Sequence, residues 1–424
     1  MSSPPTPSIS RMAFLLRAFR SHNYRLFFGG QIISLVGTWI GTTATSWLVY
    51  RLTGSGLMLG LVGFVGQFPA FFVTPFAGLT VDRWDRRYLL IATQTLSMLQ
   101  SLALAYLALT GRATIPALLA LATVQGLINA FDMPGRQSFV IDLIDHKEDL
   151  GNAIAFNSSM FNLARLVGPS IGGVLIAAWG EGWCFLADGI SYLAVITALL
   201  FIRTRPRAPR SAQMKGALGQ LMEGWRYVFK SKIIRSILLL LALSSLTGAP
   251  YMTLVPLFAG KVLHGGPHTM GFLMTSAGTG ALLGALALAA RRSSGGVESW
   301  IPLGAGIFGI GLMAFSFSKT LWLSMGLLVV CGFGFMIQMA ASNTFIQTIV
   351  EDDKRGRVMS LFIMAFLGAA PFGSLLAGSL TQKIGAPHTL LMGGICCFAG
   401  TVWFKRRDLQ SVLKKLHREG FEPS

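Results

Sequence analysis

Two acidic residues, Asp132 and Asp188, stand in segments whose other side chains are almost all apolar. A carboxylate removed from water in this way can bind and release a proton instead of staying permanently ionised. Asp188 and Asp132 are therefore the residues that we expect to carry protons. Asp188 could equally be a satisfied polar residue near a helix start, and this alternative stays open.

A full positive charge, Arg165, stands three residues before a Gly-Pro pair in NLARLVGPSIGG, residues 162–173. An arginine at the centre of a membrane helix costs about 2.5 to 3.5 kcal/mol, so a partner or a water-filled space must receive it. We expect Arg165 to form a positive wall that attracts an anionic or catechol-like molecule. The alternative is a structural ion pair with Asp132.

Small residues follow Arg165 at helical spacing. Glycines let a facing helix approach closely, and a proline deletes one backbone hydrogen bond and permits a bend. A tight seal against a helix from the other half of the chain is therefore expected from Gly168, Pro169, Gly172 and Gly173.

Polar side chains also recur at steps of three and four within apolar segments, which places them on one helix face. Such a stripe can line a polar cavity, although serine and threonine also join membrane helices through hydrogen bonds, and both readings stay open. The candidate cavity residues are Gln31, Ser34, Thr38, Thr42, Gln125, Asn129, Arg165, Gln338 and Ser342, with Thr45 continuing the first stripe.

The elements that must position these residues are membrane helices. The chain is 53% hydrophobic and 12% charged, and its mean hydropathy is +0.60. A membrane helix needs about 20 apolar residues because it must satisfy its own backbone groups. Twelve such runs predict an all-α integral membrane protein, at residues 25–49, 57–80, 88–109, 114–133, 156–178, 183–202, 235–259, 268–290, 299–317, 321–345, 358–382 and 387–404.

The net charge of +18 is distributed unevenly over the connections. If the amino terminus is cytoplasmic, 29 of the 35 lysines and arginines fall on the inner side of the membrane. This is the positive-inside pattern, which predicts that both termini are cytoplasmic. It explains the positive charge without nucleic acid, which we do not expect as a partner.

The predicted organisation has two lobes of six helices. Residues 1–23 form a cytoplasmic amphipathic segment, 24–202 the first lobe, 203–232 a cytoplasmic linker, 233–404 the second lobe, and 405–424 a basic tail. The linker is basic and proline-rich at its start, and its second part has the apolar spacing of a helix that lies on the inner leaflet.

Three motifs resemble those of the major facilitator superfamily, in the subgroup that contains the enterobactin exporter and macrolide efflux pumps. They are GLTVDRWDRR at 78–87, GPSIGG in the fifth span, and FDMPGRQSFV at 131–140, followed by LGNAIAFNSSMFNLARLVGP at 150–169. Gly/Pro interruptions also recur in the fifth span of each half, as in transporters built from repeats. The resemblance covers nearly everything between residues 20 and 405.

The resemblance implies a conformational latch on the inner side. Asp82 would meet the start of span eleven near Gly356, where a helix amino terminus favours negative charge. One of the loop arginines would pair with Asp132. The full latch set is Gly78, Asp82, Arg83, Arg86, Arg87, Asp132 and Gly356, with topology-fixing interfacial charges as the alternative. Ala122 replaces an arginine typical of drug/proton antiporters, so their proton route does not transfer.

The resemblance implies a secondary active transporter, a proton-coupled exporter of a siderophore-like or drug-like molecule that works by alternating access. The sequence has no GxxxxGK[ST] phosphate loop, so an ion gradient must supply the energy. We expect a monomer in a bacterial inner or plasma membrane, with protons, a small-molecule substrate and the lipid bilayer as partners and with no cofactor or metal. The alternatives are a nutrient importer, a lysophospholipid flippase and, less favoured, a membrane-embedded enzyme.

Overall fold

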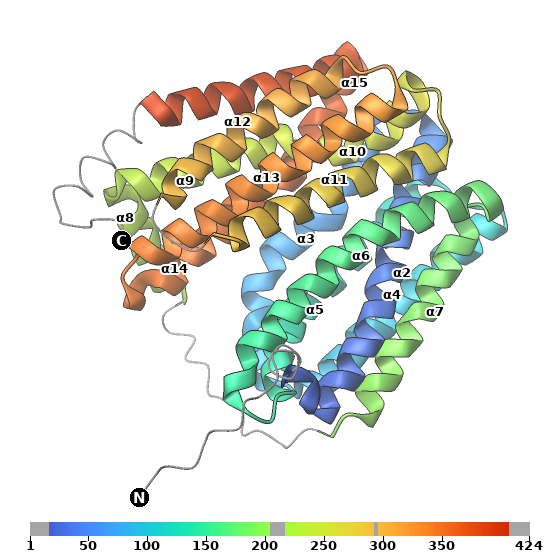
Figure 1. Ribbon diagram of the computed structural model, residues 1–424. Coiled ribbons are helices and arrows are strands. Elements are labelled where there is room, and N and C mark those ends of the chain that lie inside the picture. The colour runs from blue at the N-terminus through green and yellow to red at the C-terminus, as the bar shows by residue number, and fades with distance from the viewer. Residues whose placement is uncertain (1–16, 204–216, 292–295, 407–424) are drawn as a thin grey trace, which may run out of the picture.

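The computed structural model describes residues 17–203, 217–291 and 296–406, and all regular structure in these ranges is helical. Eleven helical stretches are long and apolar enough to cross a membrane, and the last, Asp353–Phe404, is long enough for two spans, which gives twelve spans in two lobes (Figure 1). The prediction of an all-α membrane protein with two six-helix lobes is confirmed. Most helices extend beyond the apolar runs because their polar ends continue past the hydrocarbon core.

The amino-terminal lobe holds six helices, each continuous over its whole length. They are α2 (His22–Thr53), α3 (Gly56–Arg83), α4 (Arg86–Leu109), α5 (Ile115–Asp142), α6 (Leu150–Trp179) and α7 (Glu181–Phe201), with the short turns η1 (Arg17–Arg20) and η2 (Lys147–Asp149) at the polar ends. Asp85 begins α4, and its Oδ1 accepts hydrogen bonds from the backbone N–H groups of Arg87 and Tyr88 at 2.9 and 3.4 Å. This cap satisfies two otherwise unpaired donors at the helix start.

The carboxy-terminal lobe is interrupted more often. Its first span combines α9 (Lys232–Leu243), η3 (Ser244–Gly248), α10 (Tyr251–Leu257) and η4 (Phe258–Val262), and its next three are α11 (Pro267–Ala289), α12 (Val297–Ser316) and α13 (Leu321–Ile349). The last two spans combine α14 (Asp352–Ile363), η5 (Met364–Gly368) and α15 (Ala369–Phe404). Gly385, at φ 80°, bends α15 and separates the last two spans.

Three segments of this lobe, η3, η4 and η5, are π-helical. A π turn widens the helix and leaves backbone groups without their usual partners. One of these groups is bound from outside its own helix, because the Ser245 hydroxyl in η3 donates to the Phe366 carbonyl oxygen in η5 at 2.5 Å. This bond joins two of the wide turns to each other.

The helix α8 (Ala217–Lys230) precedes the second lobe and packs against α14. Glu223 pairs with Arg357 at 2.6 Å, and the ammonium of Lys354 lies 5.1 Å from the centre of the Tyr227 ring. The rings of Trp225 and Phe229 stack on each other and are exposed. The described part of the predicted linker helix is therefore amphipathic and attached to the carboxy-terminal lobe.

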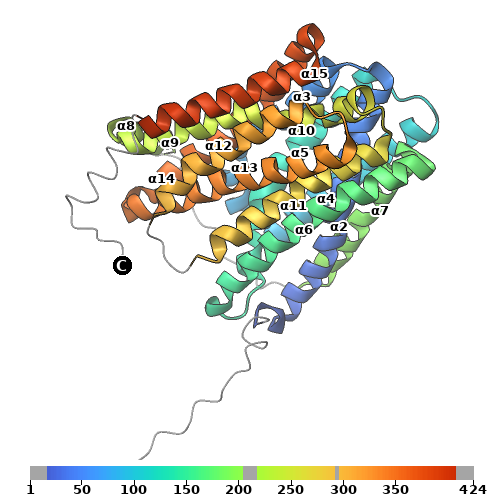
Figure 2. The ribbon, with the colours of Figure 1, turned by 45° about the horizontal axis from the view of Figure 1, so that its top comes forward.

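The lobes meet mainly through two helix pairs, α6 with α11 and α3 with α15, and α10 also contacts α2 and α3. Figures 1 and 2 show the helices of the two lobes converging at one end of the molecule and spreading apart towards the ends where α2 and α9 begin. The molecule is therefore closed at one end and open at the other.

Candidate functional site

A cavity of about 430 Å³ lies between the lobes, and the amino-terminal lobe supplies most of its wall. All six helices of that lobe contribute residues, whereas the carboxy-terminal lobe contributes only α10 and α11. The polar and charged lining residues are Thr38, Thr42, Thr45, Ser46, Gln67, Gln100, Gln125, Asn129, Arg165, Asp188, Tyr192 and Thr253.

Five of the nine predicted cavity residues line this cavity, namely Thr38, Thr42, Gln125, Asn129 and Arg165. The Gln125 amide donates to Asn129 Oδ1 at 3.1 Å and to Ser97 Oγ at 3.2 Å, which fixes its orientation. The Thr38 hydroxyl lies 3.3 Å from the Tyr192 hydroxyl. Hydrogen-bonded side chains therefore connect α4 with α5 and α2 with α7 in the wall of the cavity.

The other four predicted lining residues are buried in helix packing, so their placement in the cavity was wrong. Gln31 and Ser34 lie on the same face of α2 as Thr38 but nearer its start, in closely packed interior, where each is 2% exposed. Gln338 in α13 donates to Ser244 Oγ at 2.9 Å, and Ser342 one turn later is also fully buried. Gln338 therefore joins two helices through its amide nitrogen, as the alternative left open by the sequence expects, whereas Gln338 Oε1 and Ser342 Oγ are buried without a hydrogen-bond partner among the described residues.

Asp188 lies at the cavity wall with a side chain that is only 7% exposed. Its Oδ2 accepts a hydrogen bond from the Ser101 hydroxyl at 2.8 Å. A Cβ placed on Gly41 would approach this same oxygen to 2.7 Å, so only glycine leaves space for the carboxylate. The other oxygen, Oδ1, is buried and has no hydrogen-bond partner among the described residues.

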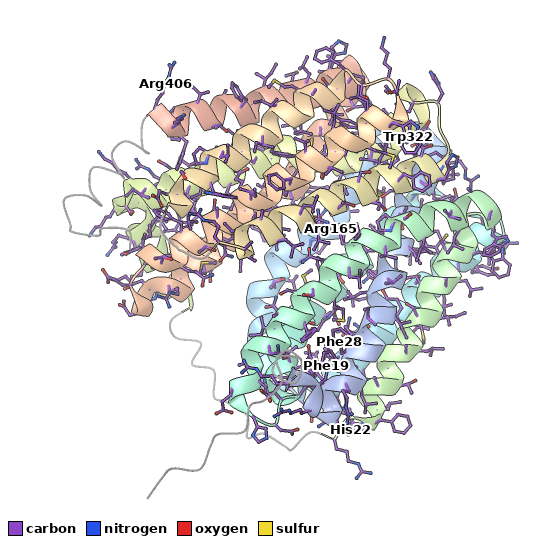
Figure 3. All side chains as sticks on the ribbon, in the orientation of Figure 1. Phe19, His22, Phe28, Arg165, Trp322 and Arg406 are labelled. Atoms are coloured by element: carbon purple, nitrogen blue, oxygen red, sulfur yellow. The ribbon has the colours of Figure 1, made fainter. Side chains whose placement is uncertain are left out.

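Arg165 lines the cavity from α6, and in Figure 3 it lies between the two lobes. Gly278 of α11 faces it closely, since a Cβ there would be 3.4 Å from the Arg165 carbonyl oxygen. The guanidinium makes no ion pair or hydrogen bond within residues 17–203, 217–291 and 296–406. Arg165 is half-buried, and its charge lies close enough to the buried Tyr251 of α10 to interact with it electrostatically.

The alternative ion pair between Arg165 and Asp132 is not formed, because Asp132 has other partners. Its Oδ1 accepts from Thr93 and Gln94 at 2.9 and 2.7 Å, and its Oδ2 pairs with Arg136. Arg136 follows Asp132 by one turn of the same helix, so this pair forms locally. Asp132 also lies outside the cavity lining, whereas Asp188 lies within it.

The latch arginines that the structure describes bind within their own lobe. Arg86 pairs with Asp142 at 2.8 Å. Arg87 donates to the carbonyl oxygens of Leu199 and Leu200, at the end of α7, at 2.6 and 2.8 Å. Neither arginine makes the expected pair with Asp132 in this conformation.

The remaining residues of the predicted latch are Gly78, Asp82, Arg83 and Gly356. Gly356 lies in α14, where an added Cβ would meet nothing within 4 Å. The lobes are apart at this end, so a contact between them cannot form in this conformation. Gly78 and the side chains of Asp82 and Arg83 lie outside the part of the chain whose surroundings the structure describes.

The predicted seal divides into two sets. Gly173 faces the other lobe, since a Cβ there would lie 2.7 Å from the Pro267 carbonyl oxygen, and the Pro169 carbonyl lies against Gly271. Gly168 and Gly172 instead contact Trp39 and Thr43 of α2. Their expected contact with the other lobe was wrong, because they lie on a different face of α6 from Gly173.

Other contacts at the closed end were missed from the sequence. The Lys261 ammonium donates to the Gly54 carbonyl oxygen at 2.7 Å, and Gln382 donates to Ser55 Oγ at 3.0 Å. Gly56 and Gly60 of α3 pack directly on Ser374, Gly378 and Thr381 of α15. The four-residue spacing of small residues, Gly56 to Gly60 and Ser374 to Gly378, was a usable signal for this crossing.

Several cavity residues were also missed, among them Gln67, Gln100 and Tyr192. Each glutamine is an isolated amide in an apolar span, which is a weak signal, and Tyr192 is one turn beyond Asp188. No group of three or more His, Cys, Asp or Glu residues in the described ranges could hold a metal ion.

Residues 15–419 match the model of a family described as transmembrane secretion effector. The chain is 28% identical to the staphyloferrin A transporter of Staphylococcus aureus, over 92% of this chain and 98% of the relative. It is 27% identical to the multidrug efflux pump Tap of Mycolicibacterium fortuitum, over 84% and 88%. A bacterial homologue of the human lysosomal transporter Spinster, in an inward-facing and occupied conformation, superimposes with a TM-score of 0.70 at 15% identity, over 92% of this chain and 98% of that structure.

Proposed function

Because the chain belongs to the transmembrane secretion effector family of major facilitator transporters, we propose that it is a proton-coupled exporter of a small molecule. The protein is a multi-pass membrane transporter of an efflux family, which excludes the membrane-embedded enzyme considered from the sequence. The proposal concerns the coupling ion, the direction and the substrate.

The observation that carries the coupling is the position of Asp188. It is the acidic residue of the cavity lining, it is nearly buried, and one carboxylate oxygen has no partner among the residues described. A group placed in this way can hold a proton or a substrate donor, but not both at once. Competition for one carboxylate is the simplest physical basis for exchanging a proton for a substrate.

The proposed orientation places both termini in the cytoplasm, with the open end of the molecule facing the same side. The charge asymmetry of the connections supports this orientation. It makes the present conformation inward-open, with α6, α11, α3 and α15 closing the outer end. In the outward-open state the lobes would close at the inner end, and the latch of residues 78–87 with Gly356 would then form.

The proposed substrate class is siderophore-like or drug-like. The named functions of two relatives, staphyloferrin A transport and multidrug efflux, support this class. So does the mixture of hydroxyl, amide, apolar and charged groups in a cavity of about 430 Å³. A monomer is sufficient, since one chain encloses the whole cavity.

Purified protein in liposomes tests the proposal. Vesicles that contain the protein in mixed orientation are loaded with radiolabelled staphyloferrin A or with a fluorescent drug-like dye, and an inward or outward proton gradient is then imposed. We expect substrate to move against the proton flow, and transport to stop when proton gradient and membrane potential are both collapsed. Unchanged accumulation after collapse, or movement of substrate in the direction of the protons, would contradict proton-coupled export.

A further inference from the structure

The cavity contains one fixed positive charge and one acid, and the structure leaves both available to a bound molecule. Arg165 and Asp188 are the only lining side chains of the Arg, Lys, Asp or Glu type among the described residues. No ion pair joins them to each other or to another described side chain. They belong to different helices, α6 and α7, but line the same cavity, so a molecule bound there can contact both.

An unpaired charge at membrane depth is costly, and a partner of opposite sign relieves this cost. The only described side-chain group that binds the Asp188 carboxylate is the hydroxyl of Ser101, which leaves Oδ1 unbound. The other lining groups close to Asp188 are neutral, namely Gly41 of α2 and Tyr192 of its own helix. On α5, Asp132 and Arg136 neutralise each other. Arg165 and Asp188 thus retain their full capacity to bind a ligand.

We infer that the substrate carries both signs of charge, with an anionic group bound to the Arg165 guanidinium and an N–H cation or amine bound to the Asp188 carboxylate. Guanidinium groups bind carboxylates in a planar, paired geometry, and a carboxylate accepts from ammonium or amine donors. The hydroxyls of Thr38 and Thr42 and the amide of Gln125 line the same cavity and suit the uncharged polar part of such a molecule.

The direction in which proton and substrate move relative to each other leads to the same conclusion. This step rests on the proposed proton-coupled export. With a purely anionic substrate, a proton on Asp188 would make the cavity more positive and would strengthen binding, so that proton and substrate would travel together. With a donor group on Asp188, proton and substrate exclude each other and are exchanged. Export driven by inward proton flow therefore requires a donor at Asp188, while Arg165 disfavours a substrate that carries only positive charge.

Three dyes with the same xanthene scaffold test this inference. An unsubstituted rhodamine has free amino groups and a free carboxylate, its methyl ester lacks the anionic group, and fluorescein lacks the amino groups. Binding to the purified full-length protein in detergent is measured by fluorescence anisotropy without any gradient. We expect the rhodamine to bind about tenfold or more tightly than either analogue, which is the usual effect of one charged hydrogen-bonded contact.

The variants assign each contact to its residue. Arg165→Gln is expected to lower the affinity for the rhodamine to that for the methyl ester and to leave the affinity for the ester unchanged. Arg165→Lys should retain part of the preference for the rhodamine over its ester. Asp188→Asn is expected to weaken the binding of the rhodamine and of its methyl ester, and to leave the binding of fluorescein unchanged. Lys383→Gln and Asp145→Asn remove one exposed charge of each sign away from the cavity and should change nothing. Thermal unfolding in detergent shows that each variant is folded.

The inference is overturned if wild-type protein binds the ester or fluorescein as tightly as the rhodamine, or binds no rhodamine. This comparison needs no variant, so a failure of Arg165→Gln to fold leaves it intact. Retained preference for the rhodamine without proton-driven transport would contradict the proposed function alone. Proton-driven export without that preference would contradict only the inference about substrate charge.

Discussion

The two lobes share an architecture but differ in what they bring to the centre of the molecule. The amino-terminal lobe contributes Arg165, Asp188 and nearly all of the hydroxyl and amide groups of the cavity. The carboxy-terminal lobe contributes Met252, Thr253 and Met274. Its helices instead contain three π-helical segments, and the described helices of the other lobe contain none.

This difference favours a division of roles between the lobes. Continuous α-helices hold polar groups at fixed positions, as recognition requires. Wide π turns interrupt the regular hydrogen-bond ladder and allow a helix to bend or shift its register. The bond between Ser245 in η3 and Phe366 in η5 joins two such turns. We therefore interpret the amino-terminal lobe as the recognition lobe and the carboxy-terminal lobe as the one that changes shape.

The largest expected effect tests the recognition role. Asp188→Asn keeps the size of the side chain but removes its ability to exchange a proton, so proton-driven transport should fall by about tenfold or more. Exchange of labelled for unlabelled substrate, which needs no net proton movement, should persist. Thr253→Val, at the carboxy-terminal wall of the same cavity, should change either rate less than about threefold, as expected for one weak neutral hydrogen bond. A larger effect of Thr253→Val would contradict the assignment of recognition to the amino-terminal lobe.

A second prediction concerns the crossing between the lobes. Gly173→Ala places a methyl group 2.7 Å from the Pro267 carbonyl oxygen, so the closed end must separate. Overpacking of this kind costs about 1 to 3 kcal/mol and should shift the population towards the state that is open at that end. Spin-label distances across the closed end would report the shift. Gly151→Ala, in the same helix with nothing within 4 Å, should leave the distances unchanged.

The smallest expected effect compares one serine from each lobe. Ser245→Ala removes the neutral bond to Phe366, worth about 1 kcal/mol, and Ser101→Ala removes the bond to the Asp188 carboxylate, worth about 1.5 kcal/mol. Ser245→Ala should change transport rate severalfold with affinity nearly constant, whereas Ser101→Ala should change substrate affinity and its pH dependence. Stopped-flow transport and equilibrium binding measure the two quantities separately. The reverse pattern would assign recognition to the carboxy-terminal lobe.

The apolar runs alone were sufficient to predict the helices and the two lobes. Lipid provides no hydrogen-bond partners, so a run of about 20 apolar residues has helix as its main solution. The motif at residues 78–87 and the glycine-proline signature led to the correct superfamily. Arg165, Thr38 and Thr42 could also be selected as cavity candidates, and Asp188 as a proton carrier, because polar groups are rare and costly in such spans.

Only the tertiary structure decided which of the similar residues face the cavity. Gln31 and Thr38 share one helical stripe, yet one is packed and the other lines the wall, because the cavity extends along only part of α2. Gly172 and Gly173 are neighbours in sequence, but their directions differ by about 100° around an α-helix, so they meet different lobes. Local spacing determines the face of a helix, whereas packing against distant segments determines what that face meets.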